Sequence, residues 1–171
     1  MASFRIGMRL SGAVPARRCF ELASMAEAFG LSSIWFAEPP MERGIAPAMG
    51  ACAMATTRIE LGIGVWSPFM RHPVQIAMDV ASLDEMSGGR LTLGLGAGLA
   101  KPIARLGIDK TQARAALSDS IAIVRGLLGG ERLDRLDAAD RVDLARRVST
   151  VRLFHRVVHR PETCGREPHQ H

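Results

Sequence analysis

The most distinctive residues that could do chemistry form a glycine cluster. The stretch GRLTLGLGAGLAKP at 89–102 has four glycines in its first ten positions. In dinucleotide-binding proteins a G-x-G-x-x-G pattern follows a strand, opens a helix and binds phosphate groups. Gly94 and Gly96 fit that pattern, but Leu99 stands where the third glycine should be. Pro102 also disfavours helical dihedral angles at the residue before it. The stretch is therefore not predicted to be a Rossmann fingerprint, and its glycines need another explanation.

The composition is that of a folded globular protein and excludes several function classes. The chain has 171 residues, is 47% hydrophobic, and carries a formal net charge of +5. Its basic residues are scattered and it has no tyrosine, so we expect no nucleic-acid partner. No apolar run approaches the roughly 18 residues of a membrane span, and no signal-peptide pattern stands at the start, so we expect a cytoplasmic protein without a membrane partner. The three cysteines form no C-x-x-C motif, so we expect neither a disulfide framework nor a metal site.

Strand and helix patterns alternate along the first 130 residues. Short β-like runs end at glycine or polar residues, and apolar stripes with a spacing of three or four residues follow them. The predicted strands cover residues 4–10, 32–38, 59–65 and 91–96. The predicted helices cover residues 15–29, 45–58, 73–86 and 111–128. Repeated βα units of roughly thirty residues require a parallel sheet with right-handed crossovers.

Two architectures satisfy this rule, a doubly wound open sheet and a (β/α)₈ barrel. Glycines lie within or at the carboxyl ends of the third and fourth predicted strands, at positions 62, 64, 94, 96 and 98. Glycine weakens a strand and is best tolerated where a ligand or another backbone approaches closely. Barrel enzymes build their active sites at this end of the strands, so the pattern favours a flat ligand at a barrel rim. The alternative is that small residues merely suit barrel packing. A complete barrel needs about 250 residues, so four units make half of one.

One long stretch resembles a known family. GIGVWSPFMRHPVQIAMDVASLDEMSGGRLTLGLGAG, at 62–98, is similar to the luciferase-like flavin- and deazaflavin-dependent oxidoreductases, and the resemblance extends from about residue 4 to 130. It implies the first half of a TIM (β/α)₈ barrel with FMN or coenzyme F420 as cofactor. GAGLAKPIARLGI looks closer to the F420-dependent branch, typified by methylenetetrahydromethanopterin reductase. The resemblance thus implies hydride transfer between F420 and a small organic substrate. The alternatives are an FMN-dependent monooxygenase and a non-catalytic half-barrel that associates with another half.

The same resemblance assigns a cofactor site. In the family, a non-proline cis peptide at the end of the third strand supports the ring, and the matching bond here is Gly64-Val65. Two rim residues follow it, and a serine there could hydrogen-bond the polar edge of the ring. Backbone N–H groups of the glycine loop suit phosphate or ring carbonyl oxygens. The expected cofactor-binding residues are Gly64, Val65, Trp66, Ser67, Gly96, Ala97 and Gly98.

Two side chains are the candidate catalytic residues. Glu38 ends the second predicted strand, where the family usually has an acid followed by a histidine and where a proton donor or orienting group is useful. Here Pro39-Pro40 follows instead, so a plain surface carboxylate is the alternative for Glu38. His72 precedes Pro73 and could either face the cofactor or cap the next helix.

After residue 130 the sequence changes character. Residues 131–171 alternate arginine and aspartate and hold four of the five histidines. They do not match the family by eye, and they could be an amphipathic helix or the product of out-of-frame or prematurely ended translation. His155 and His159 could bind a metal with Cys164 only if this segment were helical, and we do not predict a metal. Half a barrel leaves two open sheet edges, through which copies of the chain could form a homo-oligomer.

Overall fold

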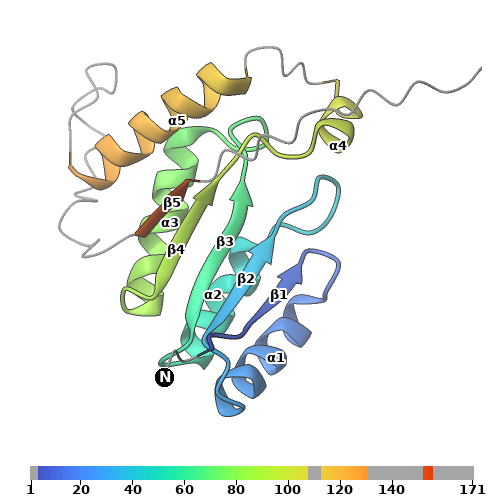
Figure 1. Ribbon diagram of the computed structural model, residues 1–171, viewed down its shortest axis with the longest axis vertical. Coiled ribbons are helices and arrows are strands. Elements are labelled where there is room, and N and C mark those ends of the chain that lie inside the picture. Colours follow the sequence, from blue (N-terminus) through green and yellow to red (C-terminus); the bar gives the residue numbers. More distant parts are fainter. Residues whose placement is uncertain (1–3, 108–112, 131–151, 156–171) are drawn as a thin grey trace, which may run out of the picture.

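The computed structural model describes residues 4–107, 113–130 and 152–155, and shows a five-stranded parallel sheet with helices between the strands (Figure 1). The strands are β1 (Gly7–Ser11), β2 (Ser33–Ala37), β3 (Glu60–Trp66), β4 (Leu91–Leu95) and β5 (Arg152–His155). The helices are α1 (Ala16–Ala28), α2 (Ala46–Ala55), α3 (Pro73–Ser87), α4 (Ala100–Ala104) and α5 (Ala113–Leu128). The strand order β1-β2-β3-β4-β5 never reverses. The predicted parallel (β/α) architecture is therefore confirmed, and the doubly wound alternative is wrong because it requires a reversal.

Two elements differ from the sequence prediction. Lys101 and Pro102 lie inside α4, although Pro102 was expected to keep its neighbour out of helical geometry. Pro102 is the third residue of this short helix, where a backbone N–H has no intrahelical partner to lose, so proline is tolerated there. No strand was predicted after residue 130, yet β5 continues the sheet parallel to β4. His155 belongs to this strand and not to a helix, while His159 and Cys164 lie outside the described residues.

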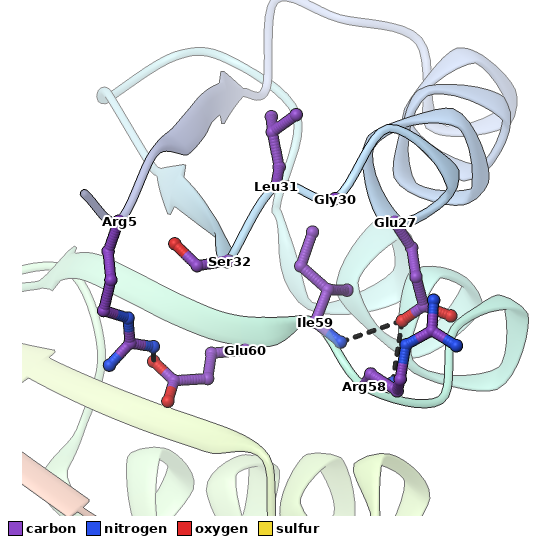
Figure 2. Close-up of a pocket in the computed structure, with 8 residues that line it drawn as sticks. All are labelled: Arg5, Glu27, Gly30, Leu31, Ser32, Arg58, Ile59 and Glu60. Atoms are coloured by element: carbon purple, nitrogen blue, oxygen red, sulfur yellow. Dashed lines mark hydrogen bonds and ion pairs between the residues drawn. The ribbon is translucent and has the colours of Figure 1, made fainter. Parts of the chain in front are cut away.

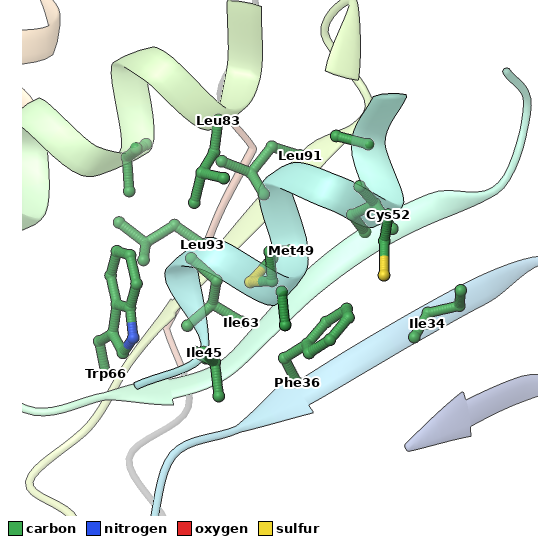
Figure 3. Close-up of a cluster of buried hydrophobic side chains, with 14 of the residues drawn as sticks. Ile34, Phe36, Ile45, Met49, Cys52, Ile63, Trp66, Leu83, Leu91 and Leu93 are labelled. Atoms are coloured by element: carbon green, nitrogen blue, oxygen red, sulfur yellow. The ribbon is translucent and has the colours of Figure 1, made fainter. Parts of the chain in front are cut away.

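The hydrophobic core lies between the sheet and helices α1, α2 and α3, which cover one of its faces (Figure 1). Alternate strand residues point into it, because successive side chains of a strand face opposite sides. Figure 3 shows the centre of this core, which includes Phe36, Met49 and Leu93. The opposite face carries a register row that runs from Arg9 through Trp35 and Gly62 to Thr92. Among the described residues, no helix is long and apolar enough to cross a membrane.

Arg90 connects three elements beneath the sheet. Its guanidinium donates to the carbonyl oxygens of Ala53, Thr56, Ile59 and Ser87 at 2.6–2.9 Å and to the Thr56 hydroxyl at 3.0 Å. These contacts join the end of α2 and the start of β3 to the end of α3, which stops at Gly88 in the left-handed region (φ 66°). The conspicuous SGGR sequence therefore stabilises the fold and lies away from the carboxyl ends of the strands.

Candidate functional site

A shallow cavity of about 150 Å³ lies at the carboxyl ends of β1, β2 and β3. Five of the nine residues singled out in the sequence line it, namely Glu38, Gly64, Val65, Ser67 and Gly98. Its walls are mostly apolar and include Pro39, Pro40, Met70, Leu99 and Ile103. The mouth is also apolar, since Met70 is 38% and Leu99 74% exposed.

The floor of the cavity is backbone. The Gly64-Val65 peptide bond is cis, as predicted, and the pairing of β3 with β4 shifts register between Ile63 and Trp66. Glycines of β4 and the loop after it give this irregular backbone its room. A Cβ at Gly96 would lie 2.9 Å from Val65 Cγ2, and one at Gly94 would overlap the Ile63 carbonyl oxygen.

The glycine loop therefore supports the floor more than it offers donors to a ligand. The Gly96 N–H donates to the Trp66 carbonyl oxygen at 3.0 Å, so it is not available to a phosphate or ring oxygen, contrary to expectation. Gly98 adopts a φ of 71° and touches the wall, because a Cβ there would lie 2.7 Å from Ile103 Cδ1. Ala97 is half-buried between them and does not line the cavity.

Trp66 does not reach the cavity. It was expected at the rim, but its side chain is fully buried in the core, with 0% of its surface exposed (Figure 3). The register shift turns it from the face it would share with Gly62 and Gly64 towards the helices. Within the described part of the chain its Nε1 has no hydrogen-bond partner. Trp66 is therefore part of the hydrophobic core and not of the cavity lining.

Glu38 is held in an ion pair. Its Oε1 accepts from Arg71 Nη2 at 2.7 Å and from the Ile45 backbone N–H at 3.0 Å, and its Oε2 accepts from Arg71 Nε at 2.9 Å. The two side chains are only 11% and 21% exposed. Arg71 also pairs with Asp79 at 3.2 Å and lies 4.6 Å above the ring of Trp66. The Glu38 hydrogen bond, opposed by burial and aided by both carboxylate charges, raises the pKa of Arg71.

The Glu38 carboxylate therefore connects three segments, which are the end of β2, the start of α2 and the loop between β3 and α3. Its oxygens are engaged by donors, so Glu38 lines the cavity as a group with a fixed position. Arg71 was quoted within the Arg-His-Pro stretch but was not singled out. Its partner lies 33 residues earlier in the chain, and no local spacing connects the two.

His72 caps a helix. Its Nδ1 accepts from the Val74 backbone N–H at 3.3 Å at the start of α3, and the side chain is exposed. It does not line the cavity. Of the two roles considered for His72, the structure shows the capping contact.

A second and larger cavity, of about 310 Å³, lies at the opposite ends of the strands (Figure 2). Three of its four charged side chains are engaged in the fold, since Arg5 pairs with Glu60 at 2.9 Å and Glu27 accepts from the backbone N–H groups of residues 57–59. Burial raises the pKa of Glu27, but these hydrogen bonds outweigh it and lower the pKa to about 2. Barrel active sites lie at the carboxyl ends of strands, so we assign the candidate site to the smaller cavity.

The residues present fit one face of a flat, largely apolar ring. Gly64 offers a floor without a side chain, the walls are apolar, and the Ser67 hydroxyl lies beside Gly98. Ser67 Oγ accepts from the Phe69 backbone N–H at 3.3 Å, which leaves its proton for a ligand oxygen. Complete small-molecule sites usually enclose about 300–1,000 Å³. The described residues therefore supply one side of such a site.

Comparison with known proteins gives a consistent result. A family model described as luciferase-like monooxygenase matches residues 1–166. A curated relative, 5,10-methylenetetrahydromethanopterin reductase from Methanolobus tindarius, is 34% identical over 119 residues. This match covers 70% of the chain but 36% of the relative, so the chain spans about a third of its length.

Solved structures share the fold. The coenzyme F420-dependent tetrahydromethanopterin reductase from Methanopyrus kandleri superposes with a TM-score of 0.77 at 21% identity, covering 90% of this chain and 50% of that one. The oxygenating constituent of 3,6-diketocamphane monooxygenase from Pseudomonas putida, in complex with FMN, superposes with a TM-score of 0.68 at 17% identity, covering 88% and 48%. Both likenesses extend over about half of the solved chain.

Proposed function

The chain belongs to the luciferase-like monooxygenase family, and we propose that it contributes to an oxidoreductase that transfers a hydride between coenzyme F420 and a small organic substrate. The observation that carries the proposal is the cavity floor at Gly64-Val65. It lies at the carboxyl end of β3, where a barrel enzyme places its ligand. The sequence identity to a methylenetetrahydromethanopterin reductase and to an F420-dependent glucose-6-phosphate dehydrogenase supports F420 over FMN.

Bound F420 supplies hydride chemistry at its deazaflavin ring, and the protein supplies position and exclusion of water. Gly64 and Val65 would hold the ring from one face and leave the other face to the substrate. The Ser67 hydroxyl would donate a hydrogen bond to an oxygen at the ring edge. The apolar side chains of Leu99 and Ile103 would help to exclude water from the reacting face. Glu38 fixes the surrounding loops through Arg71 and does not deliver a proton.

FMN-dependent oxygenation is the second candidate. The family description and the superposition on an FMN-bound monooxygenase favour it. The cavity floor accepts either ring, because flavin and deazaflavin share the same flat tricyclic shape and the floor has no side chain at Gly64.

Calorimetric titration of the protein with F420 and, separately, with FMN tests the proposal. We expect measurable binding of both, tighter for F420, and a loss of binding in Gly64→Val, which places a branched side chain on the floor. The matched control is Gly50→Ala in α2, where the added methyl meets the flexible end of Met86 and makes an ordinary contact with Leu83 Cδ2 at 3.8 Å. Tighter binding of FMN would favour the monooxygenase. Absence of binding to either cofactor would leave a non-catalytic half-barrel that associates with another half.

A further inference from the structure

Trp35 occupies an unusual position on the uncovered face of the sheet. It lies in β2 on the face opposite the helices and is half-buried. Its register partners are Arg9 on β1 and Gly62 on β3. A large indole fits there because the two residues of β3 beneath it, Gly62 and Gly64, have no side chains. A Cβ at Gly62 would lie 2.5 Å from Trp35 Cδ2, and one at Gly64 would lie 3.2 Å from Cε3.

The glycines of β3 therefore have a second role beside the cavity floor. Gly62 does not line the cavity, so no ligand contact there explains the missing side chain, whereas the indole explains it directly. Gly64 lies between the two features, since it lines the cavity on one side and meets the Cε3–Cζ3 edge of Trp35 on the other. Arg9, in register with Trp35, also lines the cavity.

We propose that Trp35, which does not itself line the cavity, is a positioning residue: it holds Gly64 in place and so fixes how deeply a ring can lie against Gly64-Val65. The proposal rests on the proposed cofactor function. Because the Cε3–Cζ3 edge of the indole lies against Gly64, the indole limits how far this part of the floor can move. In the barrel architecture, this face of the sheet is the interior, where inward side chains form layers. Trp35 belongs to the layer of inward side chains next to the proposed position of the ring.

Protection of Trp35 from oxidation tests the placement without reference to turnover. The chain has two tryptophans, and Trp66 is fully buried and serves as an internal reference. N-bromosuccinimide at limiting concentration, followed by peptide mass spectrometry, is expected to oxidise Trp35 first. Saturating F420 or FMN is expected to slow oxidation of Trp35 several-fold and to leave Trp66 unchanged.

A double-mutant cycle separates positioning from a purely structural role. Trp35→Leu is expected to weaken cofactor binding about tenfold, because the indole edge that holds Gly64 in place is lost. Gly62→Ala is expected to weaken binding as well, because its methyl displaces the indole. The double variant should bind no more weakly than Trp35→Leu alone, since a leucine leaves room for the methyl. Gly50→Ala, which keeps wild-type affinity, is the control.

The outcomes distinguish this inference from the proposed function. If the wild type binds cofactor but Trp35 is not protected, or Trp35→Leu binds with unchanged affinity, the inference is overturned and the proposed function stands. If the losses of affinity in the two single variants add up in the double variant, the inference is also overturned. Gly62→Ala would then weaken binding by a route that does not involve the indole. If the wild type binds neither cofactor, both the proposed function and the inference fail.

Discussion

Replacement of Arg71 by methionine tests whether Glu38 acts by holding the site together. Methionine keeps an unbranched apolar chain above Trp66 but removes the guanidinium that lies 2.7 Å and 2.9 Å from the two Glu38 oxygens. Breaking a buried ion pair costs about 3–5 kcal/mol, and an exposed pair is worth about 0–1 kcal/mol. The side chains are 21% and 11% exposed, which places this loss at about 2 kcal/mol.

The contact with the Trp66 ring at 4.6 Å adds about 0.5–1 kcal/mol. The total of about 3 kcal/mol corresponds to a fall in Tm of about 6–12 °C in a domain of this size. Differential scanning calorimetry measures the fall, and Arg17→Met, on the exposed face of α1, is the matched control. Glu38→Gln should cost less, because the amide oxygen still accepts from Ile45.

The combination of Arg71→Met with Glu38→Gln decides the interpretation. If the ion pair carries the effect, the double variant loses clearly less stability than the sum of the two single losses. Strict additivity would refute the pairing argument. A Glu38→Gln protein that keeps its Tm but loses all turnover would refute it differently, because it would make Glu38 the proton donor that the sequence first suggested.

Three further predictions concern the framework of the site. Arg90→Met removes five hydrogen bonds to α2, α3 and β3 and should destabilise the fold by at least about 3 kcal/mol in urea titration; Arg90→Lys should recover only part of this. The pKa of Glu27 is lowered from 4.5 to about 2, so its stabilisation is present above pH 4.5 and lost as the pH falls towards 2. The difference in Tm between wild type and Glu27→Gln should therefore shrink between pH 6 and pH 3, and a constant difference would contradict the assignment. Gly96→Ala meets Val65 at 2.9 Å and should weaken cofactor binding in calorimetry, whereas Gly96→Ala combined with Val65→Ala should restore part of the affinity.

The sequence predicted the architecture well because the periodic signals in it are local. Alternation and glycine stops located the strands at 32–38 and 91–96 within about one residue, and the uniform βα spacing predicted the parallel order. The first strand begins three residues later than expected, at Gly7. The floor at Gly64-Val65 followed from the family resemblance and is present in the structure.

The errors in the site have one physical origin, which is contact between segments far apart in the chain. Strict alternation puts Trp66 on the face of Gly62 and Gly64, but the irregular pairing of β3 with β4 turns it into the core. The ion pair of Glu38 with Arg71 was not predicted, because the two residues are 33 positions apart in the chain. Residue spacing within a single strand predicts neither the orientation of Trp66 nor the ion pair of Glu38.

The four glycines at 89–98 show how such contacts change the meaning of a motif. Gly89 has a φ of 82° just after α3, and Gly98 has a φ of 71° beside the wall, so both serve turns of the backbone. Gly94 and Gly96 leave room for β3, because a side chain at Gly94 would meet the Ile63 carbonyl oxygen and one at Gly96 would meet the Val65 side chain. The cluster thus supports the adjacent strand, whose backbone lines the cavity at Gly64 and Val65. If a cofactor ring lies there, as we propose, a glycine-rich stretch behind one strand indicates a site on the neighbouring strand, because the glycines make room for the backbone of that strand.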